Sequence, residues 1–483
     1  NGSDGTADSG KLVPGQAESY EKTENDDGTV TYTFKLRDGI KWSDGKDVTA
    51  GDFEYSWKRL VNPETAADYN YMLDGVVNAN EIIAGEKDPD ELAAKALDDK
   101  TFEVTLVNDL SYFEELCAFP AMMPVREDMI EKAGDQWTFD TSTYISNGAY
   151  KLKEWTHNSQ IVVEKNENYY DVENLGPETI TFKLMDDQNA MLSGFNSGEL
   201  DFIEDVPQAE IANLIASGDM KIVDYIGTYY VCFQTQKAPF DDPRVRKAFS
   251  LAIDRTYIVN QVTQSGQVEA GGFVPSGVYD ADGADGDDFR TVGGDYYKPT
   301  DADYEANCDE ARQLLADAGY PNGEGFPVVE YLYNTSDAHK AVAEALQFMW
   351  EEELGVKVTL NNQEWAAFLQ TRKDGDYSIA RNGWIADYND PISFLDMWMT
   401  GGGNNDAQYA NDDYDALIKQ AKTTTDNAER MDLLHQAEDK LIGEDNVLAP
   451  LYFYTQKYML ADGIEGMYYC PLGYFFFGYT HQA

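Results

Sequence analysis

The chain has 483 residues, of which 88 are acidic and 36 are basic, so its formal net charge is −52. A chain with so few basic residues has no positive field to displace counterions from phosphates, which argues against nucleic-acid binding and adsorption to anionic lipid. The length exceeds what one hydrophobic core usually serves. With 42% hydrophobic residues and 13% aromatic residues, the composition indicates two or three folded lobes.

The chain shows no segment that would span a membrane or direct secretion. No apolar run approaches the length of a transmembrane helix, and no signal peptide opens the sequence, so we expect a mature or trimmed form. The four cysteines lie far apart without a CxxC pair, which argues against a zinc or redox motif. The sequence leaves open whether any two of them form a disulfide.

Hydrophobic periodicity and turn residues predict the elements of the first half of the chain. A helix should begin after Thr49, which forms a near-match to a capping box with Asp52. Strands are predicted around an Asn147-Gly148 turn, and a helix–strand–helix pattern follows. The predicted ranges are strands 29–36, 102–106, 143–152 and 160–164, and the helix–strand–helix segment 186–210.

The second half alternates strands with helices, which is typical of α/β lobes. One helix is predicted to start at a cap formed by Asn307 and Glu310 and to end at Gly319. The acidic stretch 281–288 fails the calcium-loop template, because its acids are not spaced as that loop requires. The other predicted elements are strands 225–233, 356–360 and 451–460, and helices 245–253, 337–354, 412–423 and 426–442.

The stretch ARNGWIADYNDP, Ala380 to Pro391, fits neither a core strand nor a surface helix. It places a cation, Arg381, close to an aromatic, Trp384, and an anion, Asp387. We expect a loop or strand end whose side chains point into a cleft. Taken alone, Asp387 could instead form a structural salt bridge with Arg381, and Trp384 could serve packing.

The usual catalytic motifs do not occur. The sequence lacks HExxH, GxSxG and P-loop patterns, which removes zinc peptidases, α/β-hydrolases and nucleotide-dependent enzymes. A glycosidase needs only two carboxylates across a cleft, so a secreted glycoside-acting enzyme remains the rival hypothesis. His339 opens a predicted helix, where it is either a solvent-facing residue or a partner for an anion at the helix N-terminus.

Motifs of one protein family occur along nearly the whole sequence, in the segments 14–21, 34–69, 95–106, 147–152, 228–230, 236–255, 332–340, 361–372 and 380–395. Through these segments the chain resembles the oligopeptide-binding proteins of ABC peptide importers, within the peptide/nickel class of extracytoplasmic solute-binding proteins. The GWIADYN element in the last segment distinguishes peptide binders from the nickel and sugar branches.

The resemblance implies roles for individual residues. Asp387 corresponds to the residue that pairs with the ligand's ammonium, and Arg381 and His339 correspond to the positive pole for the peptide carboxylate. Gly383 lies where ligand backbone approaches closely. The remaining positions correspond to residues that line the cleft or its pockets: Tyr69, Trp384, Trp365, Arg372, Tyr229, Tyr230 and Tyr454.

The sequence also departs from the family pattern. The family's opening segment, which supplies an acidic residue near the ligand's amino end, is absent before 14–21, so we expect a truncated chain. A lysine that assists at the carboxylate end aligns with Thr263, and a second helper histidine aligns with Phe119. A disulfide partner aligns with Ile385, so that disulfide is not expected.

The resemblance therefore implies a three-lobed α/β fold of the periplasmic-binding-protein type, with two ligand-clasping lobes joined by a hinge and one extra lobe. We expect the extra lobe over 1–126, one clasping lobe over 127–227 and 456–483, and the other over 228–455. The implied function is capture of short peptides outside the membrane, without catalysis or a cofactor, for an ABC importer permease. We expect a monomer, either periplasmic or lipid-anchored at the cell surface. The alternatives are the glycoside-acting enzyme and a binder of a metal chelate, haem or sugar.

Overall fold

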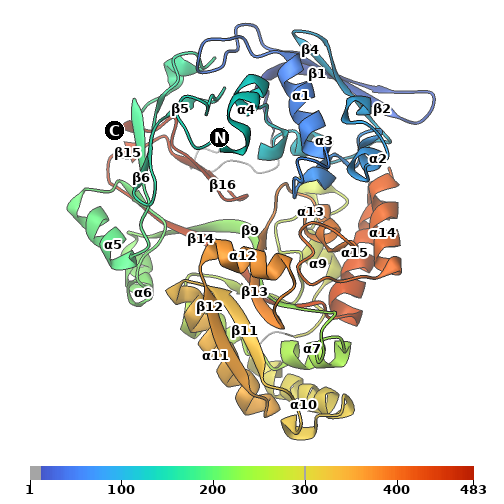
Figure 1. Cartoon of the computed structure of the whole chain (residues 1–483). Helices are drawn as coiled ribbons and strands as arrows, with labels where there is room; N and C mark the ends of the chain where they lie inside the picture. Colours follow the sequence, from blue (N-terminus) through green and yellow to red (C-terminus); the bar gives the residue numbers. More distant parts are fainter. Residues whose placement is uncertain (1–11, 299–300) are drawn as a thin grey trace. The chain divides into compact units, whose positions relative to one another are not determined.

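The structure, a computed structural model, describes residues 12–298 and 301–483. The chain divides into two compact units. The first comprises Asn1–Ile203, Leu460–Cys470 and Tyr474–Ala483, and the second comprises Glu204–Met459 and Pro471–Gly473. Both units combine helices with sheets (Figure 1), which confirms the predicted α/β class. The predicted division into three lobes, with boundaries near 126, 227 and 455, stays a prediction.

The first unit contains an antiparallel sheet with the strand order β1–β2–β4–β3. Helix α1 (Ala50–Val61) packs on this sheet through Trp57, whose ring meets Phe102 edge-on at 5.2 Å between centroids. The predicted capping box of Thr49 and Asp52 is present at the start of α1. The strands are β1 (Ala17–Glu24), β2 (Val30–Leu36), β3 (Ala94–Asp98) and β4 (Thr101–Leu106).

A second, three-stranded sheet of this unit has the order β5–β6–β7. Strands β5 (Tyr150–Thr156) and β6 (Gln160–Lys165) are joined by a turn in which Asn158 has a φ of 59°. The prediction of a turn between them at Asn147-Gly148 was therefore wrong. Those residues lie before β5, where the Asn166 side chain donates to the Gly148 carbonyl at 2.8 Å and ties them to the end of β6.

The rest of the first unit consists of short elements. The helix–strand–helix pattern predicted for 186–210 is confirmed by α5, β8 and α6, of which α6 belongs to the second unit. The other elements are α2 (Ala79–Ile83), α3 (Phe113–Leu116), α4 (Glu127–Ala133), α5 (Gln188–Ser197), β7 (Thr179–Lys183), β8 (Phe202–Ile203), β15 (Ile464–Glu465), β16 (Tyr468–Cys470), β17 (Tyr474–Phe476) and β18 (His481–Gln482).

The second unit is built on a mixed sheet with the order β10–β14–β9–β13–β11–β12. The central strand β9 pairs antiparallel with β13 and β14, whereas β11 pairs parallel with β12 and β13. This mixture matches the predicted alternation of strands and helices. The strands are β9 (Lys221–Phe233), β10 (Val268–Glu269), β11 (Val329–Asn334), β12 (Val358–Gln363), β13 (Ile379–Ile385) and β14 (Leu448–Leu460).

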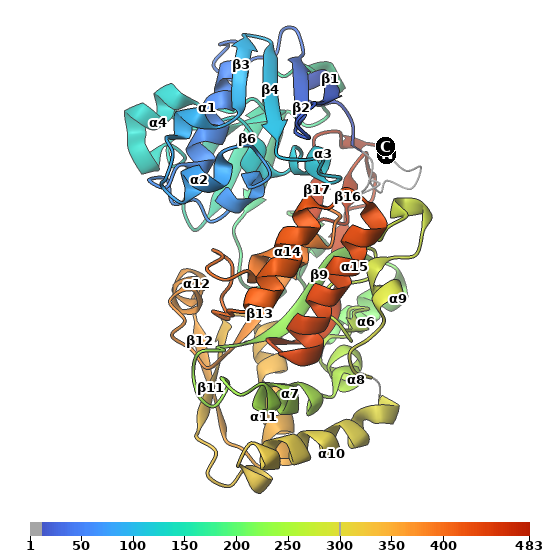
Figure 2. The same ribbon diagram turned by 90° about the vertical axis from the view of Figure 1, so that its right-hand side faces the viewer.

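Helices cover this sheet, and α14 and α15 run side by side (Figure 2). None of the helices in the described ranges is long and apolar enough to cross a membrane. The helices are α6 (Gln208–Ser217), α7 (Pro243–Leu251), α8 (Arg255–Tyr257), α9 (Phe289–Gly293), α10 (Asp301–Asp317), α11 (Asp337–Leu354), α12 (Trp365–Lys373), α13 (Ile392–Leu395), α14 (Asp412–Thr423) and α15 (Asn427–Glu438), the last continued by a π-helix, Asp439–Glu444.

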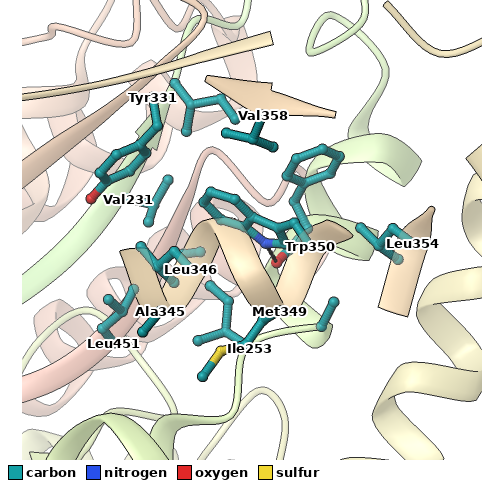
Figure 3. Packing of buried hydrophobic residues seen from close by; sticks show 14 of the residues in the cluster. Val231, Ile253, Tyr331, Ala345, Leu346, Met349, Trp350, Leu354, Val358 and Leu451 are labelled. Carbon is teal, nitrogen blue, oxygen red and sulfur yellow. Dashed lines mark hydrogen bonds between the residues drawn. The ribbon is translucent and has the colours of Figure 1, made fainter. Parts of the chain in front are cut away.

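Helix α11 has the predicted bounds and packs at the centre of the main core. Ser336 caps its start, and Gly355, with a φ of 66°, ends it in a left-handed conformation that other residues adopt at a cost. Figure 3 shows Trp350 of α11 among the side chains of neighbouring strands. Its indole Nε1 donates to the carbonyl of Phe249 at 2.8 Å, so the ring is buried without an unpaired donor.

Helix α10 differs from its prediction. It begins at Asp301, next to residues 299–300 outside the described part, so Asn307 and Glu310 lie inside it and do not cap it. The Asn307 side chain instead donates to the Lys298 carbonyl at 2.8 Å. Cys117, Cys232, Cys308 and Cys470 form no disulfide with one another.

Candidate functional site

Strand β13 carries the first half of the predicted motif. It pairs antiparallel with β9 along its whole length, from Ile379 opposite Phe233 to Ile385 opposite Gly227. On its other side, β11 pairs with it only at Ile379 and Ala380. Within the ranges that the structure describes, no strand pairs with residues 381–385 on that side, which is therefore an open edge of the sheet.

Arg381 lies where β11 and β13 separate. Its Nη1 donates to Asn334 Oδ1 and its Nη2 to the Tyr454 hydroxyl, both at 3.3 Å. The guanidinium lies 5.0 Å from the ring centroid of Tyr229, a cation–π distance. Its Nε is buried without a hydrogen-bond partner in the described residues. No carboxylate of that part of the chain pairs with Arg381, so an anionic ligand would complete this site.

Tyrosine rings surround this cation. Tyr229 stacks on Tyr452 at 4.8 Å, and Tyr452 meets Tyr454 edge-on at 5.7 Å. Burial raises the pKa of Tyr229 and Tyr452, so both stay neutral. The surroundings of Arg381 therefore consist of neutral phenols, which leave its positive charge uncompensated.

His339 sits in the first turn of α11, beside the same cluster. Its Nδ1 lies 3.4 Å from the Tyr229 hydroxyl, and burial, with the nearby charge of Arg381, lowers its pKa to about 3. His339 is therefore neutral at pH 7 in the free protein. Burial and the neighbouring Arg381 guanidinium thus disfavour a second cation here, and the role of His339 at the carboxylate pole stays a prediction.

Gly383, two residues after Arg381 on β13, is closely approached by the side chain of Tyr454. A Cβ on this residue would collide with the Tyr454 hydroxyl and would lie 3.4 Å from Arg381 Nη2. Only glycine lets the tyrosine reach Arg381 here. The expected close approach of ligand backbone at Gly383 stays a prediction.

Asp387 follows the end of β13. Its backbone N–H donates to Ser393 Oγ at 2.9 Å, whereas its Oδ2 is buried without a hydrogen-bond partner in the described residues. Burial, together with the charge of Asp396, raises the pKa of Asp387 to about 8. The alternative of a structural salt bridge between Asp387 and Arg381 is not realised, and neither group has an ionic partner in ranges 12–298 and 301–483.

The loop after β13 is fixed from several sides. The Trp384 indole donates to the Ser393 carbonyl at 2.7 Å, so Trp384 and Asp387 are both tied to Ser393. Further along, Asp390 and Arg430 form a buried bidentate ion pair with distances of 2.6 and 2.8 Å. These contacts fix the backbone of the loop that carries Asp387.

Arg372, Trp365 and Tyr230 lie in different surroundings. Arg372 is paired with Asp406 at 3.2 Å, and its Nη1 donates to the Arg381 carbonyl at 3.4 Å. Trp365 is 53% exposed at the start of α12. Tyr230 points to the opposite face of the sheet from Tyr229, where it packs against Phe273 and Trp398, and our candidate site leaves it out.

Tyr69 belongs to the first unit, where its ring lies 5.3 Å from that of Phe119. Its predicted place beside the cleft stays a prediction. In the second unit, Thr263 stands where the family has a lysine, and its uncharged hydroxyl group supplies no positive charge. This side chain is buried and hydrogen-bonded to Gln267 at 3.0 Å. Ile385 packs close to Gly227.

The sequence did not identify three residues of the site: Tyr452, Asn334 and Asp406. Tyr452 shares the period-two face of β14 with Tyr454, so its alternation could have indicated it. Asn334 and Asp406 carry no such signal, because their roles depend on contacts between distant segments. The part of the chain that the structure describes contains no group of three or more His, Cys, Asp or Glu able to hold a metal ion. The assembled groups are suited to binding a molecule with two opposite charges.

Comparison with known proteins identifies similar chains. Residues 11–406 match the family described as bacterial extracellular solute-binding proteins, family 5. The periplasmic oligopeptide-binding protein OppA of Salmonella typhimurium is 39% identical over 95% of this chain and 82% of its own length. The dipeptide-binding protein DppE of Bacillus subtilis is 36% identical over the same shares.

Solved structures agree with these relatives. The Haemophilus influenzae OppA complex with the peptide RPPGFSPFR superposes with a TM-score of 0.86 at 34% identity, covering 95% of this chain and 88% of that one. Listeria monocytogenes OppA bound to peptide superposes with a TM-score of 0.88 at 30% identity, covering 99% and 92%. These similarities confirm the resemblance inferred from the motifs.

Proposed function

Because the chain belongs to family 5 of the bacterial extracellular solute-binding proteins, we propose that it captures short peptides outside the membrane for an ABC importer. One observation carries this proposal. Two partly buried groups that lack an ionic partner among the described residues, Arg381 and Asp387, lie at the two ends of an open strand edge. A peptide offers the opposite charges at its ends and main-chain groups between them.

In this proposal, the peptide ammonium pairs with Asp387 and the carboxylate with Arg381. Buried ion pairs of this kind are strong when both partners are hydrogen-bonded, and they fix the direction of the ligand. The main chain of the peptide adds to the open edge of β13, since buried backbone groups need partners. Trp384, Trp365 and Tyr454 line the places of peptide side chains, together with Arg372 and Tyr229.

The permease of the importer is the proposed protein partner. We place the protein in the periplasm or, lipid-anchored, on the cell surface, and we propose that it acts as a monomer of three lobes. The proposed role is binding, without chemical conversion of the ligand. The matched relatives give no support to a glycoside-acting enzyme or to a binder of sugar, haem or metal chelate.

Native mass spectrometry of the purified chain tests the proposal. We expect a disperse excess mass from mixed bound peptides, which disappears after denaturation and refolding. Calorimetry on the refolded protein should then show binding of peptides with free ends. N-acetylated and C-amidated versions should bind at least about tenfold more weakly, since each leaves one buried charge unpaired. A homogeneous mass together with no binding across a peptide library would contradict the proposed function.

A further inference from the structure

The open edge of β13 presents a small and defined set of main-chain groups. The N–H of Ala386 donates to the carbonyl of Ile226 at 2.8 Å, which continues the pairing with β9. In an antiparallel pair, the residues that bond to one neighbour alternate with those that face away. Arg381, Gly383 and Ile385 therefore direct their main-chain groups to the open side.

Side chains of the protein already occupy two of these groups. The N–H of Gly383 donates to Asn382 Oδ1 at 2.8 Å. The carbonyl of Arg381 accepts from Arg372 Nη1 at 3.4 Å. Beyond Arg381, which adjoins the pairing with β11, the carbonyl of Gly383 and both main-chain groups of Ile385 have no hydrogen-bond partner among the described residues.

The Asn382 side chain is held in this position. Its Nδ2 donates to Asp406 Oδ2 at 3.1 Å, and the same oxygen pairs with Arg372 Nη2 at 3.2 Å. Asn382 is 4% exposed and Arg372 is 8% exposed. Moving Asn382 would therefore remove one hydrogen bond from Asp406 Oδ2 and the acceptor of the Gly383 N–H, which is unfavourable.

A peptide with its ammonium at Asp387 and its carboxylate at Arg381 runs antiparallel to β13. Its first residue then lies opposite Ile385 and exchanges two hydrogen bonds with it. Its third residue lies opposite Gly383 and donates its N–H to the free Gly383 carbonyl. The carbonyl of the third residue finds no donor, because Asn382 occupies the N–H of Gly383.

This register distinguishes peptides by their length. In a tripeptide, the third carbonyl is part of the terminal carboxylate, which is free to turn to Arg381. In a tetrapeptide, it is an amide carbonyl, which finds no main-chain donor on β13 once Asn382 holds the N–H of Gly383. A dipeptide ends one residue before Gly383, so it does not use the free Gly383 carbonyl.

We propose that the Asn382 side chain, fixed by Asp406 and Arg372, ends the pairing edge of β13 and makes three-residue peptides the preferred ligands. This inference rests on the proposed peptide-binding function. It assigns Asn382 the role of a residue that sets ligand length without contacting either end of the peptide.

Calorimetry with alanine peptides of two to five residues tests this inference. The whole chain is used, after denaturation and refolding to remove bound peptide. We expect trialanine to bind at least about tenfold more tightly than dialanine, tetraalanine or pentaalanine, since the longer peptides leave a main-chain carbonyl without a donor on β13. Tetraalanine or pentaalanine binding as tightly as trialanine would overturn the inference and leave peptide binding itself intact. Absence of binding at every length would instead contradict the proposed function.

A variant separates the role of Asn382 from general effects. Asn382→Ala frees the N–H of Gly383, so the preference for trialanine over tetraalanine should fall to about threefold or less. Asn361→Ala is the control, because Asn361 is an asparagine of β12 that bonds only on the surface, to Glu330 at 2.8 Å. An unchanged preference in folded Asn382→Ala would overturn the assignment to Asn382. The length series on the unaltered protein tests the preference itself if that variant does not fold.

Discussion

The hydroxyl group of Tyr454 occupies the space beside Gly383 that the Cβ of any other residue would fill. The same hydroxyl accepts a hydrogen bond from Arg381 Nη2 at 3.3 Å. A glycine on one strand thus allows a tyrosine from another to orient the cation of the site. The orientation matters because the cation has no carboxylate to fix it among the described residues.

Gly383→Ala should therefore weaken peptide binding without unfolding the protein. The added methyl group displaces Tyr454 from Arg381, and overpacking of this kind costs about 1–3 kcal/mol. We expect a loss of roughly tenfold or more in affinity, measured by calorimetry with a tripeptide. Gly15→Ala is a suitable control, since nothing lies within 4 Å of a Cβ at Gly15.

The double variant Gly383→Ala/Tyr454→Phe tests the cause. Removing the hydroxyl relieves the closest collision, so the two substitutions should not add. Additive losses would show that Gly383 acts by another route than Tyr454.

Asp387→Asn should weaken binding of peptides with a free amino end by about 2–5 kcal/mol, the usual cost of unpairing a buried charge. N-acetylated peptides should bind the variant and the unaltered protein with nearly equal affinity. Asp432→Asn, at an exposed carboxylate of α15, provides the control and should leave the affinity unchanged. Equal weakening for free and acetylated peptides would contradict the pairing of Asp387 with the ammonium.

The fold was largely predictable because its signals are local. The capping box at Thr49 and the bounds of α11 depend on residues close in sequence, and both predictions are confirmed. The prediction of a hairpin turn at Asn147-Gly148 was wrong because the distant side chain of Asn166 holds Gly148 in a loop before β5. Asn307 resembled a helix cap, but the helix extends through it.

The site was predictable only in part. Arg381, Gly383 and Asp387 share one short motif, so their proximity follows from the sequence. The charge state of His339 does not follow from the sequence, because its low pKa results from burial on helix α11 and from the charge of Arg381 on strand β13. Nor could the sequence show that Asp406 fixes Asn382, since 24 positions separate these two residues.

The pH dependence of binding should reveal the state of Asp387. Its pKa of about 8 means that the carboxyl group is mostly protonated at pH 6 in the free protein. Peptide binding favours the ionised form, so it should release a proton, and affinity should rise as the pH increases from 6 towards 8. Above pH 8 the peptide's own ammonium, with a pKa of about 7.7–8.0, loses its proton and affinity should fall.

Calorimetry in buffers with different ionisation enthalpies measures this proton release directly. At pH 6.5 the unaltered protein should release up to about one proton per peptide, and Asp387→Asn should release none. The folded-state pKa lies above the usual value, so Asp387 disfavours folding progressively as the pH rises from about 4 to 8. The melting temperature of empty Asp387→Asn should accordingly exceed that of the unaltered protein at pH 8, and the difference should shrink towards pH 4. Proton release equal in both proteins would contradict the assignment.

Glu438→Gln should reduce stability strongly. Glu438 is fully buried, and its Oε1 accepts from Arg290 Nη1 and from the N–H groups of Phe273 and Val274, each at 2.8 Å. Removing its charge leaves Arg290 buried without a counterion, which costs about 3–5 kcal/mol of unfolding free energy. Urea denaturation of the empty protein should show this as a lower midpoint.

The exposed ion pair of Glu444 with Lys440, at 3.2 Å, provides the matched control for this measurement. Glu444→Gln should change the unfolding free energy by less than about 1 kcal/mol, since solvent screens the pair. In folded Glu438→Gln at low temperature, tripeptide affinity should stay within about threefold of the unaltered value, because Glu438 does not contact Arg381 or Asp387 in the bonds it forms. Equal losses of unfolding free energy in the two variants would show that the buried Glu438–Arg290 pair stabilises the fold no more than the exposed pair does.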